Sequence, residues 1–529
     1  MAAKKATAAA AAAAEATAVE PVADKIPTDS PLITAFKAAR RVSTPIVAIE
    51  TPDAASTIMS IRKVLSEKSP VLSWDCARGL RGLNELGKSA MGTLGVDPAV
   101  TVNAAETLLA CENLPDLSVV FMHNFHRQLG DAATAQALWN LRDVFKVNKR
   151  MIVPLGPAFQ MPAELAGDVI ILDEPLPTRD ELSVTLDQQH KNAELALPDD
   201  ETRGAALDAL VGLSSFTAEQ VAAMSLTKKG VDVAKLWERK VKAIQNTDGL
   251  RVWQGRPGDT TMDELRGIDN VVEFMRKLII ADAFGAIVFI DEMDKAFAGG
   301  MSEHTGDSGV SKDQVGTLLS YIEDTQSLGV LLAGVAGTGK TQLVKAMGLE
   351  AGKPVIVFDL GGMKGGVVGE SERHIRAALK VVSATAEGRV LFVGTANRTT
   401  LFTPELNRRF PDQFFYDTPD DAGRSAIWPV YVKKNGLTAS QAAIPEGFDR
   451  GWTGAEIKRA CERAALFGST VVDASRFIIP SSVSGKAVIE NLRREAAGRF
   501  LSASHDGLYT LPQSPEVAVP LRTRSVEVN

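Results

Sequence analysis

Cysteine is scarce in this sequence, and its few cysteines are scattered. Cys76, Cys111 and Cys461 are the only three among 529 residues, and no two of them form a Cys-x-x-Cys pair. Such usage is typical of a reducing compartment and gives no support for a disulfide framework or a structural zinc site. We therefore expect a cytoplasmic protein.

Long hydrophobic runs and an excess of positive charge are missing as well. No stretch of about 18 consecutive apolar residues occurs, so the sequence predicts no membrane span. The formal net charge of −7 argues against a protein that binds nucleic acid mainly through electrostatics, because such a protein needs a strongly basic face. Residues 1–30 are rich in alanine and lack the hydrophobic core of a secretory signal, which predicts a disordered tail.

Two segments alternate between strand and helix patterns. In residues 31–177, short runs rich in β-branched residues are bounded by turn formers, as expected of buried parallel strands, and stretches with helical spacing separate them. The alternation resumes in residues 249–419. Each segment predicts an α/β domain with a parallel sheet flanked by helices. The expected strands of the first domain are 45–50, 71–75, 117–122, 150–154 and 168–172.

Helical sequence follows each α/β segment. Residues 178–248 begin with Thr178 and Glu181 in the spacing of a capping box, and they predict a helical subdomain. Glycines and a proline at 246–262 indicate a linker at the domain boundary. Residues 420–505 predict a second helical region, and residues 506–529 an irregular tail.

The second α/β segment contains a complete phosphate-binding loop, or P-loop. Gly334-Val-Ala-Gly-Thr-Gly-Lys-Thr341 fits the pattern Gly-x-x-x-x-Gly-Lys-Ser/Thr, between a predicted strand and a predicted helix. The glycines let backbone N–H groups converge on phosphate oxygens, and the helix adds its unpaired N–H groups and the positive end of its dipole. Lys340 is expected to reach the β- and γ-phosphates, and the Thr341 hydroxyl to ligate Mg²⁺. The motif predicts binding of ATP with Mg²⁺ by Gly334, Val335, Ala336, Gly337, Thr338, Gly339, Lys340, Thr341 and Gln342.

Two further predicted strands end in polar residues that suit ATP hydrolysis. The apolar run 286–290 is followed by Asp291 and Glu292. Asp291 is a candidate to hold Mg²⁺, and Glu292 to polarise the attacking water. The run 389–397 ends at Asn397, a candidate to hydrogen-bond the γ-phosphate or the water, with Thr395 a weaker candidate.

Two charged pairs near these strands each allow two interpretations. Arg408 and Arg409 are adjacent, and a guanidinium supplied by a neighbouring subunit would stabilise the charge that develops on phosphoryl oxygens. The alternative is a surface patch. Asp294 and Lys295 belong either to a subunit contact or to a solvated surface.

These segments together resemble an AAA+ ATPase. Gly369-Glu-Ser-Glu372 and Trp452-Thr-Gly-Ala-Glu-Ile457 match two more segments of that family. The resemblance covers residues 31–505 and is to the FtsH-like AAA proteins of phage and of plastid or cyanobacterial genomes. It implies a P-loop AAA+ module with a helical lid, preceded by a degenerate AAA-like α/β module.

The resemblance also implies roles for particular residues. Asp291 and Glu292 correspond to the Walker B pair, and Asn397 to the sensor-1 residue. Either Arg408 or Arg409 corresponds to the arginine finger. Gly454 and Ala455 correspond to the start of the lid helix, near the adenine.

The order of the segments departs from that of the family. Walker B normally follows Walker A, whereas here Asp291 precedes Gly334 by 43 residues. The block 285–327 looks like a segment that has moved from between Glu387 and Gly388. Because a sheet assembles in space, we expect the strand to keep its place in the sheet; a misassembled, inactive site is the alternative.

A second departure concerns the central pore. Members that thread protein usually carry an aromatic residue ahead of the Gly-Glu-Ser-Glu segment, and residues 362–369 contain none. Met363 or Lys364 is left as a candidate to grip a substrate. The departure argues against strong processive unfolding.

The first α/β domain resembles an AAA-type fold without its phosphate loop. Its first strand ends in Ile49-Glu-Thr-Pro-Asp53, with no glycine and no lysine, and Asn124 stands where a carboxylate is expected. We interpret this domain as a nucleotide-free scaffold. His123 and His126 have no third ligand in the sequence, which argues against a metal site.

Three functions are compatible with these features. The first is a ring, expected to be hexameric, that couples ATP hydrolysis to remodelling of a protein partner the sequence does not identify. The second is a slowly hydrolysing, nucleotide-dependent switch or scaffold, which the missing pore aromatic favours. The third is a nucleic-acid motor or loader, against which the net charge argues. A zinc protease of the FtsH type is excluded because there is no His-Glu-x-x-His motif.

Overall fold

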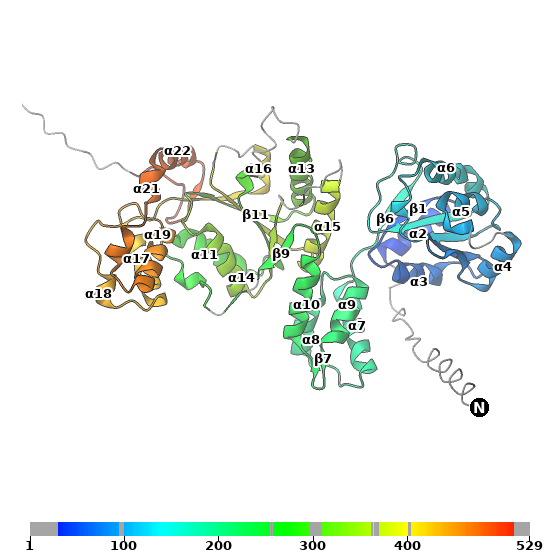
Figure 1. Ribbon diagram of the computed structural model, residues 1–529, viewed down its shortest axis with the longest axis horizontal. Coiled ribbons are helices and arrows are strands. Elements are labelled where there is room, and N and C mark those ends of the chain that lie inside the picture. Colours follow the sequence, from blue (N-terminus) through cyan, green and yellow to red (C-terminus); the bar gives the residue numbers. More distant parts are fainter. Residues whose placement is uncertain are drawn as a thin grey trace, which may run out of the picture. The chain divides into compact units, whose positions relative to one another are not determined.

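The chain divides into two compact units, Met1–Ala243 and Ile244–Asn529 (Figure 1). The computed structural model describes residues 30–94, 100–253, 255–256, 258–295, 308–360, 363, 370–399 and 404–512. Of the predicted tail 1–30, only Ser30 is among them, and its hydroxyl accepts a hydrogen bond from Ile33 N–H at 3.3 Å as the N-cap of α2. None of the helices in the described parts of the chain combines the length and the hydrophobicity that a membrane crossing needs.

The first unit contains the predicted α/β domain. Its sheet has the strand order β3-β2-β4-β5-β1-β6, and every neighbouring pair is parallel except β2 and β3. Side chains alternate between its faces, so that Val47 and Ile49 pack with α2 and α3 while Ala48 packs with α5 and α6. The elements are α2 (Pro31–Arg41), β1 (Val47–Glu50), α3 (Ala54–Val64), β2 (Val71–Asp75), β3 (Gly79–Gly82), α4 (Glu85–Leu94), α5 (Ala104–Cys111), β4 (Val119–Met122), α6 (Ala132–Val147), β5 (Met151–Gly156) and β6 (Ile170–Asp173).

Two strands of this sheet differ from the prediction. The run 168–172 was expected to be buried, but β6 pairs only with β1, and Ile170 and Ile171 are 42% and 43% exposed. As an edge strand it is covered less fully than the central strands. Strand β3 was not predicted, because its one large apolar residue, Leu80, gives no alternating pattern; its pairing with β2 creates the strand.

The rest of the first unit is helical, with one short hairpin that was not predicted. The Thr178–Glu181 capping box is present, with Glu181 N–H donating to the Thr178 hydroxyl at 3.4 Å. The elements are α7 (Arg179–Asn192), α8 (Asp200–Leu210), α9 (Ser215–Ser225), β7 (Leu226–Thr227), β8 (Gly230–Val231) and α10 (Val233–Gln245), of which α10 runs past Ala243.

The second unit is built on a sheet with the order β15-β14-β11-β13-β10-β12-β9, parallel except for β9. Figure 1 shows this sheet between α11 and α14 on one face and α13, α15 and α16 on the other, in agreement with the two buried apolar clusters. The elements are β9 (Leu250–Trp253), α11 (Asp269–Ile280), β10 (Ala286–Ile290), α13 (Ser308–Asp324), β11 (Leu328–Gly334), α14 (Lys340–Ala351), β12 (Val355–Phe358), α15 (Glu370–Thr385), β13 (Val390–Ala396), α16 (Pro404–Arg409) and β14 (Asp412–Tyr416). The predicted α/β fold is therefore confirmed.

Strand β10 precedes β11 in the chain but is separated from it in the sheet by β13. It pairs in parallel with β13 on one side and β12 on the other, and its five residues are buried. Gly285, just before β10, donates through its N–H to Arg389 O at 2.7 Å, and a Cβ on Gly285 would lie 2.3 Å from Ala386 O. The start of the block 285–327 thus lies against the Glu387–Gly388 junction, so its chain order does not prevent β10 from joining the sheet.

Both sheet edges are formed by segments predicted to be something else. Leu250–Trp253, predicted as part of a linker, is β9, because pairing with β12 satisfies its backbone. At the other edge, β15 (Leu501–Ser502) pairs with β14, although residues 420–505 were predicted as helical. Within the predicted irregular tail, Gly507–Tyr509 folds back on this strand through hydrogen bonds from Ser502 N–H to Gly507 O and from Tyr509 N–H to Phe500 O.

The lid helices form a separate apolar cluster around Trp428, Trp452 and Ile457. The last of the C-terminal helices, α22, does not join this cluster, since Leu492 and Ala496 belong to the core on the face of the sheet that α13, α15 and α16 cover. The elements are α17 (Asp421–Lys434), α18 (Ala439–Ala442), α19 (Gly454–Phe467), α20 (Val471–Ser475), α21 (Ser481–Ser484) and α22 (Lys486–Ala496).

Candidate active site

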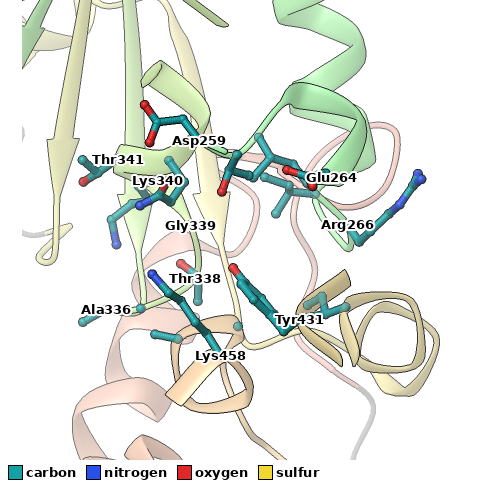
Figure 2. Close-up of a pocket in the computed structure, with 18 of the residues that line it drawn as sticks. Asp259, Glu264, Arg266, Ala336, Thr338, Gly339, Lys340, Thr341, Tyr431 and Lys458 are labelled. Atoms are coloured by element: carbon teal, nitrogen blue, oxygen red, sulfur yellow. The ribbon is translucent and has the colours of Figure 1, made fainter. Parts of the chain in front are cut away.

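A cavity of about 700 Å³ lies where the parallel strands β10, β11 and β13 end (Figure 2). The P-loop, the residues that follow β10 and β13, the segment before α11, and the lid helices α17 and α19 all contribute to its wall. The lining residues are Gly258, Asp259, Thr260, Glu264, Leu265, Arg266, Ile268, Asp291, Glu292, Ala336, Gly337, Thr338, Gly339, Lys340, Thr341, Gln342, Thr395, Asn397, Ile427, Tyr431, Lys434, Asn435, Gly454, Ala455, Lys458 and Glu462.

The P-loop takes a backbone path that requires glycine. Gly334, Gly337 and Gly339 have φ angles of 136°, 80° and 102°, a region that other residues rarely adopt. A Cβ on Gly334 would lie 2.1 Å from the Tyr416 carbonyl oxygen, and the next N–H, of Val335, donates to that oxygen at 2.9 Å. Gly334 and Val335 therefore lie behind the cavity, fixed to β14, whereas Ala336 to Gln342 line it.

Lys340 is the most buried cation of the cavity. Lys340 is only 7% exposed, and its Nζ donates to the carbonyl oxygens of Gly334 and Val335, each at 2.9 Å. Burial lowers the pKa of Lys340 to about 8, against the opposing effect of the Asp294 and Asp291 carboxylates. A polyanion in the cavity would favour the charged form, so the site is electrostatically suited to phosphate.

Asp291 and Glu292 line the cavity, and Thr395 orients both. The Thr395 hydroxyl donates to Asp291 Oδ1, and Glu292 N–H donates to Asp291 Oδ1 and to Thr395 Oγ1, each at 3.1 Å. Glu292 has a φ of 51°, a left-handed conformation that costs free energy in a non-glycine residue and that these contacts hold in place. Its carboxylate pairs with Lys295 Nζ at 2.6 Å. Thr395, predicted as a weaker phosphate candidate, is thus a residue that positions the acidic pair.

Of the two predicted interpretations of Asp294, the solvated surface is wrong. It is 5% exposed, so it is not on a solvated surface, and it accepts a hydrogen bond from Asn397 N–H at 3.3 Å inside its own chain. It therefore ties the turn after β10 to the turn after β13. Lys295 is exposed and pairs with Glu292.

Arg408 and Arg409 do not line this cavity but lie on α16. Arg409 forms an ion pair with Glu323 of α13, and its side chain is only 11% exposed. Arg408 is exposed and has no ion pair among the described residues. The two neighbouring arginines therefore differ sharply in their availability to another chain.

The lid closes the cavity directly onto the P-loop. Ala455 N–H donates to Gly337 O at 3.0 Å, so Gly454 and Ala455, at the start of α19, lie against the P-loop and line the cavity. Figure 2 shows Tyr431 and Lys458 extending from the lid helices toward the P-loop residues Lys340 and Thr338.

Several lining residues were not predicted. Ile427, Tyr431 and Lys434 lie on one face of α17, and Lys434 crosses to Glu264 at 2.6 Å, which joins the lid to the segment before α11. The spacing of Gly454, Lys458 and Glu462 at four residues could have indicated one face of α19. No such spacing marked the segment 258–268, and its first residues were predicted to belong to a linker.

The donors present suit ATP with Mg²⁺. Thr341 and Asp291 offer the oxygen ligands that Mg²⁺ prefers, and the described residues contain no cluster of three His, Cys, Asp or Glu side chains that would favour another metal. His123 and His126 accordingly belong to no such cluster. Met363 is fully buried in the core, which corrects its prediction as a substrate grip, while Lys364 and Gly369 lie outside the described residues.

Two protein-family models match the chain. Residues 33–174 match the SpoVK-like AAA ATPase, N-terminal domain, and residues 330–393 match the ATPase family associated with various cellular activities (AAA). The second match includes the P-loop and the first part of β13, as far as residue 393. Strand β10 lies outside it.

Relatives that cover much of the chain share low identity with it. It is 22% identical to the uncharacterized AAA domain-containing protein ycf46 of Guillardia theta, over 89% of this chain and 96% of the relative. The protein of the same name from Trieres chinensis is 23% identical over 60% of this chain and 65% of the relative, just under two thirds of its length. The ATP-dependent zinc metalloprotease FtsH of Paraburkholderia phymatum is 28% identical over 30% of this chain and 34% of the relative.

Proposed function

We propose that this chain, whose second unit contains an AAA domain, binds and hydrolyses ATP as a ring-forming AAA+ protein and uses the energy to remodel a protein partner. The observation that carries the proposal is that Lys340, Glu292 and Asn397 line the same cavity as the lid helices. These residues come from three strand ends and provide a phosphate-binding group, a carboxylate base and an amide. The test is ATP hydrolysis by the purified chain and its loss in the variants described below.

The chemistry follows from the position of each group. Backbone N–H groups of the P-loop and the start of α14 hold the phosphates, and Lys340 neutralises them. Glu292 accepts a proton from a water whose oxygen attacks the γ-phosphorus, while the bond from phosphorus to the β,γ-bridging oxygen breaks to give ADP and phosphate. Asn397 orients that water or the γ-phosphate. Mg²⁺, which Thr341 and Asp291 would hold, supplies charge neutralisation on the phosphates.

Arg408, and not Arg409, is the proposed arginine finger. Arg409 is engaged with Glu323 in its own chain, whereas the exposed Arg408 is available to a nucleotide in a neighbouring subunit. An arginine that acts in trans also requires a ring or another assembly. The proposed assembly is a homohexamer.

Arg408→Ala is expected to lower kcat by roughly 10- to 100-fold with little change in melting temperature. Arg409→Ala, the matched control, should lower the melting temperature because the nearly buried Arg409 side chain loses its packing together with its ion pair to Glu323. Steady-state ATPase assays measure kcat, and thermal unfolding measures the melting temperature. If Arg408 acts in trans, the specific activity of the wild type should also fall over a dilution series, as the assembly dissociates. A dilute monomer with full activity would contradict the ring.

A nucleotide-dependent switch is the second candidate function. Burial of Met363 removes one of the two side chains proposed to grip a threaded substrate. A switch needs the same nucleotide site but not a gripping pore. The Glu292→Gln variant discussed below separates the two.

Nucleotide affinity is expected to fall as pH rises through about 8. The pKa of Lys340 is lowered to about 8, so the amine loses its proton above that pH, whereas phosphate binding requires the charged form. Binding must then take up a proton, and Kd should rise about tenfold per pH unit above pH 8 while staying nearly constant below pH 7. Titration with a fluorescent ADP analogue from pH 6.5 to 9.5 checks this.

Lys340→Arg provides the control for this pH dependence. A guanidinium does not titrate in this range, so whatever the affinity of the variant, its Kd should not rise between pH 7 and 9.5. A flat wild-type profile over the same interval would contradict the assignment of Lys340.

A further inference from the structure

The start of α11 is held by a segment more than 200 residues away in the chain. The first N–H groups of a helix lack acceptors within it, and Ile268 at the N-cap offers no side-chain acceptor. Instead, Val271 N–H donates to the carbonyl oxygen of Ala503 at 3.1 Å. The Asn270 amide donates to the carbonyl oxygens of Ser502 at 2.6 Å and His505 at 3.0 Å. A strand and turn at the C-terminal side of the lid thus cap α11.

The same segment is fixed to the sheet on its other side. β15 pairs with β14, and Ala503 N–H donates to Phe415 O at 3.0 Å. The Tyr509 hydroxyl donates to Asp417 Oδ2 at 2.7 Å, and Arg493 Nε donates to the same carboxylate at 2.9 Å. Residues 500–509, which we call the C-terminal clasp, therefore have a defined position against β14.

The contacts of the clasp with α11 and with β14 are both next to residues that form or support the cavity. Leu265, Arg266 and Ile268, directly before α11, line its wall, and the Ser504 hydroxyl donates to Gly267 O at 2.7 Å. On the sheet side, the carbonyl of Tyr416 in β14 holds the P-loop through Val335 N–H. The C-terminal clasp connects the wall before α11 to the strand that anchors the P-loop.

We propose that the C-terminal clasp is a positioning element of the nucleotide site, which fixes the wall 265–268 relative to the P-loop. The inference rests on the proposed function, since it concerns the same cavity. Figure 2 shows Glu264 and Arg266 across the cavity from Thr341, so the wall faces a part of the nucleotide away from the γ-phosphate. A wall that is held less firmly should therefore weaken nucleotide binding more than it slows the chemical step.

The test is the double variant Asn270→Ala/Ser504→Ala. It removes the three side-chain hydrogen bonds between the clasp and the start of α11 and leaves the pairing of β15 with β14 and the cavity-lining residues unchanged. The expected result is a rise of about 5- to 30-fold in KM for ATP and in Kd for a fluorescent ADP analogue, with kcat within about twofold of wild type. Restoring the hydroxyl as Ser504→Thr with Asn270 intact should return KM to near the wild-type value.

The matched control is Asn491→Ala/Ser484→Ala, which removes the same side-chain groups from exposed positions of α22 and α21 in the same unit. Its KM and Kd should equal those of wild type. If the double clasp variant keeps the wild-type KM while wild type binds and hydrolyses nucleotide, the inference is wrong and the clasp is only a structural support. If wild type binds no nucleotide at all, the proposed function fails first, and the inference fails with it.

Discussion

Lys340→Ala is expected to reduce ATP hydrolysis by roughly 1000-fold. The P-loop would keep its glycines and backbone N–H groups, but the only cation buried among them would be gone. That ammonium, now bonded to the carbonyl oxygens of Gly334 and Val335, is the group that the phosphates are expected to recruit. Because Lys340 is buried, its charge acts through a lower effective dielectric than that of a surface lysine, so its loss should weaken both binding and turnover.

Steady-state ATPase assays and ADP titrations measure the two losses separately. Lys345→Ala is the matched control: it is on the same helix α14, its ammonium lies 6.0 Å from the centroid of the Trp253 ring, and it does not line the cavity. Its activity should stay within about twofold of wild type. Undiminished hydrolysis by Lys340→Ala would mean that the cavity is not the active site.

Glu292→Gln is expected to lower kcat by roughly 1000-fold while leaving nucleotide affinity nearly unchanged. Glutamine has almost the same size and keeps the hydrogen bonds of the Glu292 N–H to Asp291 and Thr395, but it cannot accept the proton of the attacking water. Loss of the ion pair with Lys295 adds little, because both side chains are exposed. The effect should therefore appear in single-turnover hydrolysis and not in ADP binding.

Glu462→Gln is the control for this variant. Glu462 also lines the cavity but belongs to α19 of the lid, so hydrolysis should change by less than about threefold. An equal loss in both variants would argue against Glu292 as the base. With ATP bound, the Glu292→Gln assembly should retain a protein partner in the ring if the chain is a remodeller, whereas a switch should only remain in its partner-binding conformation.

Much of the fold was predictable because local patterns report it. The central parallel strands β1, β2, β4, β5, β10, β11 and β13 coincide with apolar runs, and the Thr178–Glu181 spacing correctly indicated the start of α7. Of the four edge strands of the two large sheets, only β6 overlaps a predicted strand. Strands β3, β9 and β15 are only two to four residues long, too short to predict a strand by their own pattern, so pairing with a neighbour already in place makes them strands.

The difference between the two arginines could not be predicted from the sequence. Arg408 and Arg409 are chemically identical neighbours on one short helix. Their difference comes from Glu323, 86 residues earlier, which reaches Arg409 and leaves Arg408 exposed. Asp294 is a similar case, since its burial depends on the turn at Asn397, 103 residues later.

The phosphate-binding loop can be read directly from eight consecutive residues, because they specify a backbone path that requires glycine and a lysine at a fixed distance. The surroundings of that loop follow from long-range contacts instead. The order of strands in the sheet, the closure of the lid onto Gly337 and the cap that the C-terminal clasp places on α11 all depend on hydrogen bonds between distant residues. Such partners are chosen by packing in space, so no local pattern encodes them.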